Sequence, residues 1–466
     1  MNDVVASNKL SRRSFLVAMG TTALGAALAA CAPAGAPAAP AAAPAAGGES
    51  QAAAPSGEKV SIHAHMVKKQ DVSDWIQMGL DQDIDGFKSK NPDIEVVLET
   101  IPGWTAEYVP KILSLAAAGT LGDLVWFPPR HRSHIAWGTS YNVVTDLNPL
   151  AEAAGYDMKA NFFQGAIDVN SAEGKQYWMS YISEPVVPVI AYNKTKANEN
   201  GMGIPSDDWT FDELAAWAQK GTTADVFGYH SADRSYIAFS GAPFLRQWGV
   251  EQVDAEGKKS LVLDSDNLAK ALKYDFDLTN TLKVSPSPSA GAINDPELFG
   301  GQKVLAVDIW PFRIQIYPDT FKDFEIDFVL TPVVNKGDKR RSMLNEHVFG
   351  VTTTSKAPAE AFTFLTWIAG KEMNVQALIQ GQKGPIARAD VWADDRVYEK
   401  QPTYKKLKPI MESIEPDFNV ANFRGEEYDN TFQAVYDKLI LNQVTPEQAV
   451  QEIHDTVQAV LDKEPA

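Results

Sequence analysis

Cysteine is nearly absent from this chain, whose 466 residues contain a single one, Cys31. One cysteine excludes an intramolecular disulfide framework and any zinc or iron–sulfur site built on several thiolates. Basic side chains are also scarce, with 42 Lys and Arg against 60 Asp and Glu and a net charge of −18. Because nucleic-acid-binding surfaces are built from Lys and Arg, this balance argues against nucleic acid as a partner.

The common catalytic signatures are missing as well. No Gly-x-Ser-x-Gly elbow, P-loop, dinucleotide fingerprint or His-Glu-x-x-His motif occurs. Two histidine pairs have metal-ligand spacing, His63-x-His65 and His131-x-x-His134. Since neither pair has an identified third ligand, we interpret them as ordinary polar histidines and expect no metal site and no cofactor. A glycoside hydrolase site built on paired carboxylates stays open as an alternative, because the distance between such carboxylates is set by the fold and not by their spacing in the sequence.

The N-terminus has the composition of an export signal. Residues 11–16 read Ser-Arg-Arg-Ser-Phe-Leu, which is typical of the twin-arginine export address. The apolar run over 15–30 has 16 residues, fewer than the ~20 of a membrane span. Leu-Ala-Ala-Cys over 28–31 resembles the bacterial lipoprotein box, which implies a signal peptide over 1–30 and lipid attachment at Cys31. The alternative is an ordinary cleaved signal with an incidental cysteine.

A linker is predicted after the signal. Residues 31–57 comprise 13 Ala, 5 Pro and 4 Gly among 27 residues and include no large apolar side chain. Such a segment buries too little surface to offset the entropy of ordering it. We therefore expect an exported body tethered by Cys31 to the outer face of the cytoplasmic membrane, in a periplasm or at the cell surface.

The remainder, 58–466, alternates helix and strand patterns. One helix is predicted by apolar residues spaced at i, i+4, i+8 and i+11: Ile76, Leu80, Ile84 and Phe87. An alternating strand follows over 94–98, a helix over 111–118 and a buried strand over 124–127. This β–α succession predicts an α/β fold with parallel strands and crossover helices.

Two helix starts carry a capping box, in which a Thr side chain and the side chain three residues on satisfy each other's backbone N–H groups. These are Thr210 with Glu213, and Thr445 with Gln448. Each precedes an apolar stripe at helical spacing, so both predict amphipathic helices.

Aromatic residues are plentiful, and all eleven tryptophans lie in 58–466. Trp217 and Trp367 sit on apolar helix faces and are expected in the core. Trp126, Trp248 and Trp310 lie at strand ends or beside Gly and Pro, where an indole is costly unless it covers something. Because aromatic faces suit the C–H-rich faces of pyranose rings, these three are candidate ligand contacts, with core packing as the alternative.

A series of short motifs also occurs in a recognisable order. They are Phe87-x4-Pro92-x-Ile94-x-Val96, Tyr108-x2-Lys111, Asp123-Leu124-Val125, Gly174-Lys175-x-Tyr177, Tyr192-Asn193-Lys194, Trp209-Thr210-Phe211-Asp212-Glu213-Leu214, Gly301-Gln302-Lys303-Val304-Leu305-Ala306 and Ala359-Glu360-Ala361-Phe362-x-Phe364-Leu365. The ordered set resembles the extracellular solute-binding proteins of ABC importers, in the carbohydrate-binding group that includes maltose-binding protein. It covers nearly all of 58–466.

The resemblance implies a two-lobed periplasmic-binding-protein fold. Each lobe would be a central, mostly parallel sheet flanked by helices, and a hinge of several crossing segments would join the lobes, with ligand in the cleft between them. The expected boundaries are 58–186 plus 345–385 for lobe 1 and 187–344 plus 386–466 for lobe 2. The expected crossings lie near 184–190, 341–347 and 384–388.

The resemblance also implies which residues contact ligand. Stacking aromatics are expected at Trp126, Phe244, Trp310 and Tyr428. Hydrogen bonds to hydroxyl groups are expected from Arg130 and Glu184. With Trp248 from the tryptophan argument, these residues form the predicted site.

Such a protein does no covalent chemistry, so we do not expect an enzyme. A sugar or oligosaccharide would favour closure of the lobes, and the closed protein, expected to be a monomer, would dock on the membrane permease of an ABC importer. Two alternatives stay open: a lipid-anchored carbohydrate-active enzyme such as a glycosidase or lyase, and a binding protein for a non-sugar solute such as a polyamine.

Overall fold

The computed structural model describes most of the chain after residue 58. The described residues are 59–68, 75–102, 105–127, 133–231, 237–264, 266–287, 295–381, 384–418, 420–422 and 424–463. All of them belong to one compact unit, Gly57–Ala466. The predicted signal peptide, the linker and Cys31 lie outside the described residues.

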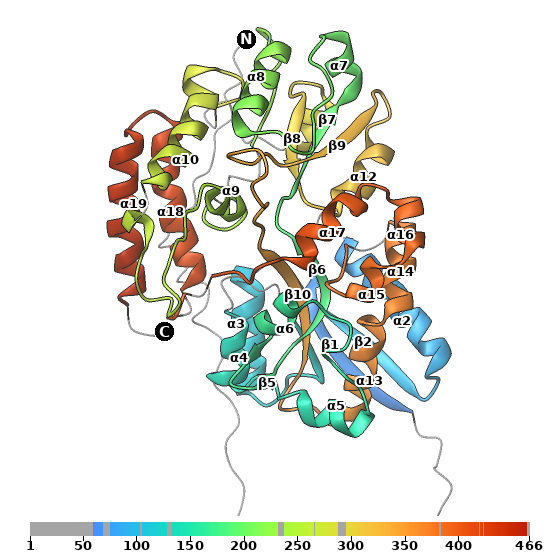
Figure 1. The fold of residues 1–466 in the computed structure, drawn as a ribbon. Coiled ribbons are helices and arrows are strands. Elements are labelled where there is room, and N and C mark those ends of the chain that lie inside the picture. Colours follow the sequence, from blue (N-terminus) through green and yellow to red (C-terminus); the bar gives the residue numbers. More distant parts are fainter. Residues whose placement is uncertain are drawn as a thin grey trace, which may run out of the picture. The chain divides into compact units, whose positions relative to one another are not determined.

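The first sheet has five strands in the order β2-β1-β3-β10-β6 (Figure 1). Their bounds are β1 (Val60–Lys68), β2 (Ile94–Pro102), β3 (Leu124–Phe127), β6 (Met179–Pro185) and β10 (Leu344–Val351). β1 pairs in parallel with both β2 and β3, whereas β10 runs antiparallel to β3 and β6. The strands predicted over 94–98 and 124–127 are confirmed.

Helices α2 (Trp75–Lys90) and α3 (Thr105–Ala117) make the two crossovers of this sheet. The chain moves from β1 outward to β2 and then back past β1 to β3, so right-handed crossovers place the two helices on opposite faces. α13 (Pro358–Ile368) packs on α2, where the rings of Phe87 and Phe364 meet edge to face at 5.1 Å. The helices predicted from the apolar spacing are therefore confirmed.

Shorter elements complete this part of the chain. They are α4 (Ile135–Thr139), α5 (Asn148–Ala154), α6 (Gln164–Val169), the hairpin β4 (Ser171–Ala172) and β5 (Lys175–Gln176), α14 (Lys371–Gln380), α15 (Ala389–Trp392), α16 (Asp395–Lys400) and α17 (Tyr404–Glu412).

The second sheet has three strands in the order β8-β7-β9. β7 (Val189–Asn193) is buried along its whole length between β8 (Ala306–Ile309) and β9 (Ile326–Leu330), and both pairs are antiparallel. Among the described residues, the strands of this sheet pair in parallel only at isolated bridges, such as that between His230 and Val307. This sheet is thus less parallel than expected, because β7 leads away from the first sheet while β8 and β9 both run back toward it.

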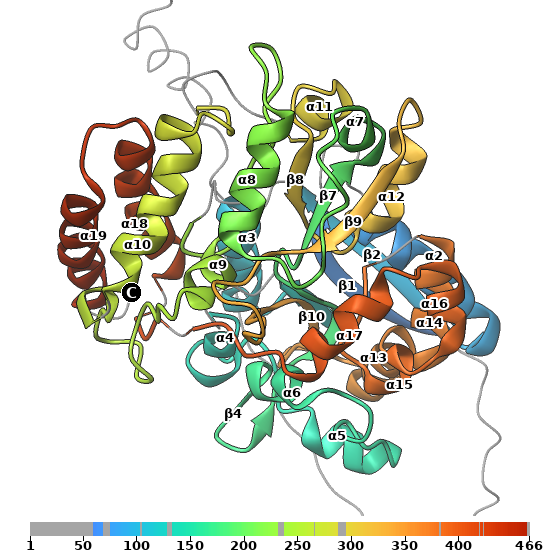
Figure 2. The ribbon, with the colours of Figure 1, turned by 45° about the horizontal axis from the view of Figure 1, so that its top comes forward.

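Helices cover the second sheet and extend beyond it. Their bounds are α7 (Lys194–Glu199), α8 (Phe211–Gly221), α9 (Ala242–Gln247), α10 (Asn267–Phe276), α11 (Asp295–Gly300), α12 (Arg313–Thr320), α18 (Gly425–Ile440) and α19 (Pro446–Leu461), with short 3-10 and π segments at Val262–Asp264 and Asp277–Thr281. Both predicted capping boxes are present, at the starts of α8 and α19. Figures 1 and 2 show α10, α18 and α19 side by side, and they share one apolar cluster.

The chain passes between the two sheets at two places. It leaves β6 at Pro185 and enters β7 at Val189, and it returns just before Leu344 opens β10. Residues 385–389 hydrogen-bond to first-lobe segments, and α15 and α16 pack on α14. We therefore propose a third passage near Ser413–Asp417, after α17, rather than at residue 386.

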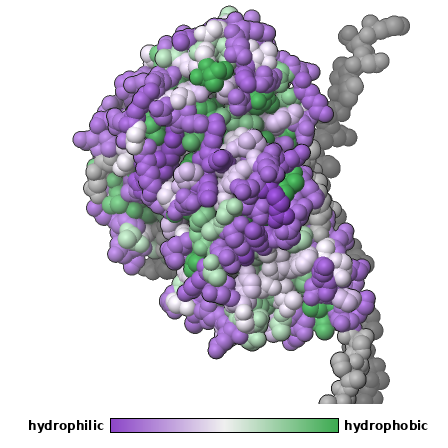
Figure 3. Space-filling model, turned by 45° about the vertical axis from the view of Figure 1, so that its right-hand side comes forward, coloured by the Kyte–Doolittle hydropathy of each residue, from purple (hydrophilic) through white to green (hydrophobic). Residues whose placement is uncertain are grey.

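No helix in the described part of the chain is both long and apolar enough to cross a membrane. The face drawn in Figure 3 is mainly hydrophilic, with apolar residues scattered over it. The large apolar residues that are exposed lie far apart in the sequence: Tyr141, Ile204, Leu263 and Leu441.

Candidate functional site

The carboxyl ends of four first-sheet strands meet at one edge. β1, β2 and β3 are parallel and end at Lys68, Pro102 and Phe127. β6 runs in the same direction, since both it and β3 are antiparallel to β10, and it ends at Pro185. Ligands of open α/β sheets bind outside such an edge, so this edge is the first-lobe side of the candidate site.

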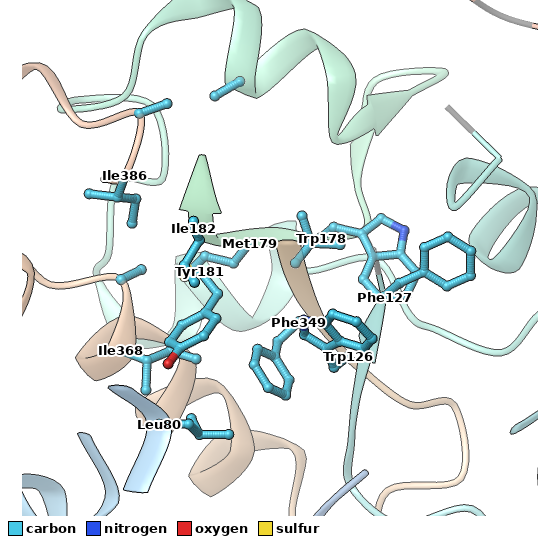
Figure 4. Close-up of a cluster of buried hydrophobic side chains, with 14 of the residues drawn as sticks. Leu80, Trp126, Phe127, Trp178, Met179, Tyr181, Ile182, Phe349, Ile368 and Ile386 are labelled. Carbon is cyan, nitrogen blue, oxygen red and sulfur yellow. The ribbon is translucent and has the colours of Figure 1, made fainter. Parts of the chain in front are cut away.

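Trp126 lies at this edge, one residue before β3 ends, and it is fully buried. Its ring stacks on the His347 imidazole at 5.6 Å and meets the Tyr108 ring edge to face at 5.6 Å. The Tyr108 hydroxyl also donates a hydrogen bond to the backbone oxygen of Trp126. Figure 4 shows Trp126 close to Phe349, its register partner on β10, within the buried cluster of the first lobe.

Glu184, at the end of β6, is buried and faces the second lobe. Its Oε2 accepts a hydrogen bond from the backbone N–H of Phe312 at 3.3 Å. Phe312 is the N-cap of α12, so the carboxylate meets the positive end of a helix dipole. Beside this contact, the Tyr404 hydroxyl donates to the backbone oxygen of Pro311. Burial raises the Tyr404 pKa, and the nearby Glu184 raises it further.

Trp310 is the first residue after β8 and is half-buried. Its ring lies 6.3 Å from that of Phe239. Trp310 stands two residues before Phe312, so it belongs to the short second-lobe segment that contacts Glu184. Of the predicted site residues, Glu184 makes the contact with the other lobe, and Trp310 lies two residues from its partner Phe312.

Phe244 lies on α9 and Trp248 is the C-cap of that helix, and both belong to an aromatic cluster with Phe211 and Tyr274. The Phe211 ring stacks on Trp248 at 5.6 Å and meets Phe244 edge to face at 5.4 Å. The Trp248 indole nitrogen is buried and has no hydrogen-bond partner among the described residues. The cluster thus holds these two rings largely by contacts within the second lobe.

Tyr428 is fully buried on α18, where its hydroxyl donates to Gln252 at 3.4 Å and its ring lies 5.6 Å from Phe418. Burial raises its pKa well above the usual value, with Asp429 and Asp417 adding to the effect. Arg130 lies outside the described residues.

Two residues of this region were not predicted from the sequence. Phe312 caps α12 and bonds Glu184, and the motif Trp310-Pro311-Phe312, two aromatics around a proline just after a strand, was the available signal. His347 stacks on Trp126, but nothing in its local sequence indicates this, because the partner lies 221 positions earlier in the chain.

A cavity lies where the passages meet the second lobe, enclosing about 530 Å³ with its open mouth included. Its walls come from Val186–Pro188, from Arg340–Ser342, from α9 and from the ends of β8 and β9. Phe244 lines it as well.

The histidine pair on β1 faces the carboxylate of Glu99. His63 Nδ1 lies 2.6 Å from Glu99 Oε1, and His65 Nδ1 lies 3.4 Å from Glu99 Oε2. His65 Nε2 accepts the backbone N–H of Gly122, so its proton sits on Nδ1 and leaves no lone pair there for a metal. Burial lowers the His65 pKa. His134 donates from Nε2 to the Val169 oxygen within the core, and the described residues hold no group of three metal ligands.

Comparison with known proteins places this fold in a family. Residues 83–406, well over half of the chain, match the family described as bacterial extracellular solute-binding protein. The arabinooligosaccharide-binding protein of Bacillus subtilis (strain 168) is 23% identical over 384 residues, which cover 78% of this chain and 85% of that protein.

Solved structures share the fold at low identity. An ABC substrate-binding protein from Listeria monocytogenes, solved in complex with cycloalternan, is 19% identical with a TM-score of 0.71 and covers 86% of this chain and 99% of its own. The GacH receptor of Streptomyces glaucescens, solved unliganded and with acarbose, is 17% identical with a TM-score of 0.71, at 87% and 99% coverage. The two-lobed α/β fold is thereby confirmed, and the chain belongs to the bacterial extracellular solute-binding protein family.

Proposed function

We propose that this protein is the substrate-binding component of an ABC importer and captures a sugar or oligosaccharide between its lobes. The observation that carries the proposal is the contact of Glu184, at the carboxyl edge of the first sheet, with the segment that begins at Trp310 in the second lobe. A ligand between an acceptor on one lobe and an aromatic face on the other gains contacts only when the lobes approach. Its binding therefore favours closure.

The roles of the residues follow from their chemistry. Glu184 accepts hydrogen bonds from sugar hydroxyls, and charge makes such bonds stronger than neutral ones. Trp310 supplies an aromatic face, and the Phe312 ring beside it is a second candidate. Trp126, Trp248 and Tyr428 are buried or held in aromatic clusters in the present lobe arrangement, so they reach a ligand only after rearrangement. Phe244 lines the cavity in the present arrangement. Arg130 keeps its proposed role as a donor to hydroxyls.

The relatives support a carbohydrate as the ligand. The Bacillus protein is named for arabinooligosaccharides, and the Listeria and Streptomyces structures contain cycloalternan and acarbose. We extend this class of ligand to the present protein. We also propose that it binds its ligand without catalysis and that its closed form docks on a membrane permease.

The N-terminal part of the proposal concerns location. Export by the twin-arginine route, lipid attachment at Cys31 and the linker over 31–57 would place the body outside the cytoplasmic membrane within reach of the permease. We also expect a monomer, since the described residues expose few large apolar side chains.

A panel of candidate ligands tests the proposal. Purified protein is heated with arabino-oligosaccharides, maltodextrins, cyclic glucans and polyamines, and the same mixtures are analysed for product. A sugar that raises the melting temperature without turnover supports the proposal, since a ligand at 100 times its Kd stabilises by about 2.7 kcal/mol. Product formation would establish the enzyme instead, and stabilisation by polyamines alone would replace the sugar with a cation.

A further inference from the structure

The passages between the lobes are joined by hydrogen bonds into a short ladder. The Val186 N–H donates to the Met343 oxygen at 2.9 Å, and the Ser342 hydroxyl donates to the Val186 oxygen at 3.1 Å. The third passage joins on the other side, where the Leu344 N–H donates to the Glu415 oxygen. These hydrogen bonds resist relative movement of the three segments, so bending between the lobes is expected at the residues just beyond the ladder.

Val187 is the first residue beyond the ladder on the second-lobe side, and its backbone is strained. Its φ is 39°, in the left-handed region that a β-branched residue rarely enters. Pro188 follows, and a residue before proline is normally pushed to extended conformations. The other described non-glycine residues with positive φ are all unbranched at Cβ: Asn142, Glu173, Lys283, Gln302 and Asn442. Such strain persists only where surrounding contacts impose it.

The cavity described above lies directly against this residue. Val187 lines it together with its neighbours Val186 and Pro188, and the second passage lines the opposite part through Arg340–Ser342. Protein interiors are close-packed, so a buried side chain can change conformation only where free volume exists. The cavity supplies that volume beside Val187.

Ion pairs hold the passages to the second lobe at the same place. One Arg341 nitrogen, Nη2, lies 2.7 Å from Glu251 Oε1 and 2.8 Å from Glu415 Oε2. Arg246, buried on α9, reaches the same two carboxylates at 3.4 and 3.5 Å and donates to the Pro416 oxygen. Two of these pairs, Arg341–Glu251 and Arg246–Glu415, join the second and third passages to the second lobe, so movement of the passages against that lobe would break them.

We propose that the strained backbone of Val187 and the ion pairs of Arg341 act in opposite directions on the equilibrium between the present lobe arrangement and a second one. In the second arrangement Val187 returns to negative φ by moving into the cavity. The strain favours that second arrangement, and the ion pairs favour the present one. Both residues then set ligand affinity without touching the ligand, a consequence that rests on the proposed function, whereas the lobe equilibrium does not.

The test measures the distance between the lobes without ligand. The full chain carrying Cys31→Ser has no other cysteine, so Glu152→Cys on α5 and Lys220→Cys on α8, both exposed, can be spin-labelled specifically. Val187→Gly, which adopts positive φ without strain, is expected to raise the ratio of the present to the second arrangement by about tenfold. Arg341→Gln is expected to lower that ratio by a similar factor.

Matched controls separate a change of equilibrium from a general change of stability. Glu173→Gly relieves positive φ in the β4–β5 turn, and Arg396→Gln removes ion pairs to Glu372 and Asp394. Neither control is expected to alter the distance distribution. Val187→Asn, which tolerates left-handed φ, replaces the glycine variant if that variant does not fold.

Unchanged distances in both test variants, or a shift of both in the same direction, would overturn the proposal. If the sugar panel identifies a ligand, its affinity must change in opposite directions in the two variants. If the panel identifies none, the proposed function fails while the distance measurement still decides the role of Val187.

Discussion

The backbone N–H of Phe312 donates a hydrogen bond to the Glu184 carboxylate at 3.3 Å and thereby joins the start of α12 to the end of β6. β6 belongs to the first sheet, and α12 follows a strand of the second. The contact therefore reports the distance between the lobes. A ligand hydroxyl that enters this place competes for the same carboxylate oxygens.

Glu184→Gln tests the carboxylate directly. The amide keeps the size of the side chain but loses the charge that strengthens hydrogen bonds to hydroxyls, so sugar affinity should fall about tenfold. Titration calorimetry with the sugar identified by the panel measures the change. Glu399→Gln, exposed on α16, is the matched control and should leave affinity unchanged. Equal affinity in the two variants would remove Glu184 from the site.

Trp310→Ala removes the half-buried aromatic that follows β8. Loss of its stacking face should weaken sugar binding at least tenfold while the protein stays folded. Two comparisons define the effect. Tyr141→Ala, at an exposed ring of the first lobe, should change nothing, and Trp217→Ala, in the core, should lower stability by about 3–5 kcal/mol without changing the affinity of the folded fraction. A Trp310 variant that binds as tightly as the parent would contradict the stacking role.

Local sequence was sufficient for the elements whose structure depends on neighbours in the chain. The capping boxes at Thr210 and Thr445 place the starts of α8 and α19, and the apolar run over 124–127 matches β3 residue for residue. These features depend on hydrogen bonds and burial within a few residues, which spacing reveals.

The contacts around the site could not be predicted from local sequence. Trp126 is buried because Tyr108 and His347 pack on its ring, and His347 comes from a strand added to the sheet much later in the chain. The antiparallel pairing of β7 likewise follows from the direction in which β8 and β9 run. The residues of β7 alone do not indicate that direction. Long-range contacts of this kind leave no periodic signal in one sequence.

Cys31→Ser tests the proposed lipid anchor. Without the thiol no acyl chain can be attached, so the protein should move from the membrane pellet to the soluble exported fraction of its host. Immunoblots of fractionated cells measure the shift, and incorporation of a labelled fatty acid should be lost in parallel. A variant that stays in the pellet would contradict the anchor. Replacing Arg12 and Arg13 by lysines should instead retain the protein inside the cell, which separates export from anchoring.

Glu346 predicts how stability depends on pH. This buried residue of β10 accepts hydrogen bonds from Ser180 and Asn170, and burial raises its pKa to about 8. In the unfolded chain the carboxyl ionises at its ordinary, lower pKa. Between those two values the folded state binds the extra proton, so stability falls as pH rises, by about 1.4 kcal/mol per pH unit for this one group. Above about pH 8 the fall from this group ends, because both states are ionised.

Glu346→Gln isolates that contribution. Glutamine keeps the shape and a polar end but does not ionise, so the variant should show a flatter stability curve from pH 5 to 8 and should exceed the parent in stability at pH 8. Urea unfolding at each pH measures the free energy of unfolding. Glu256→Gln, at an exposed position, should follow the parent curve throughout. If the Glu346 variant keeps the parent's slope, another group is responsible for the pH dependence, since the raised pKa of Glu346 requires that slope to disappear with the carboxyl.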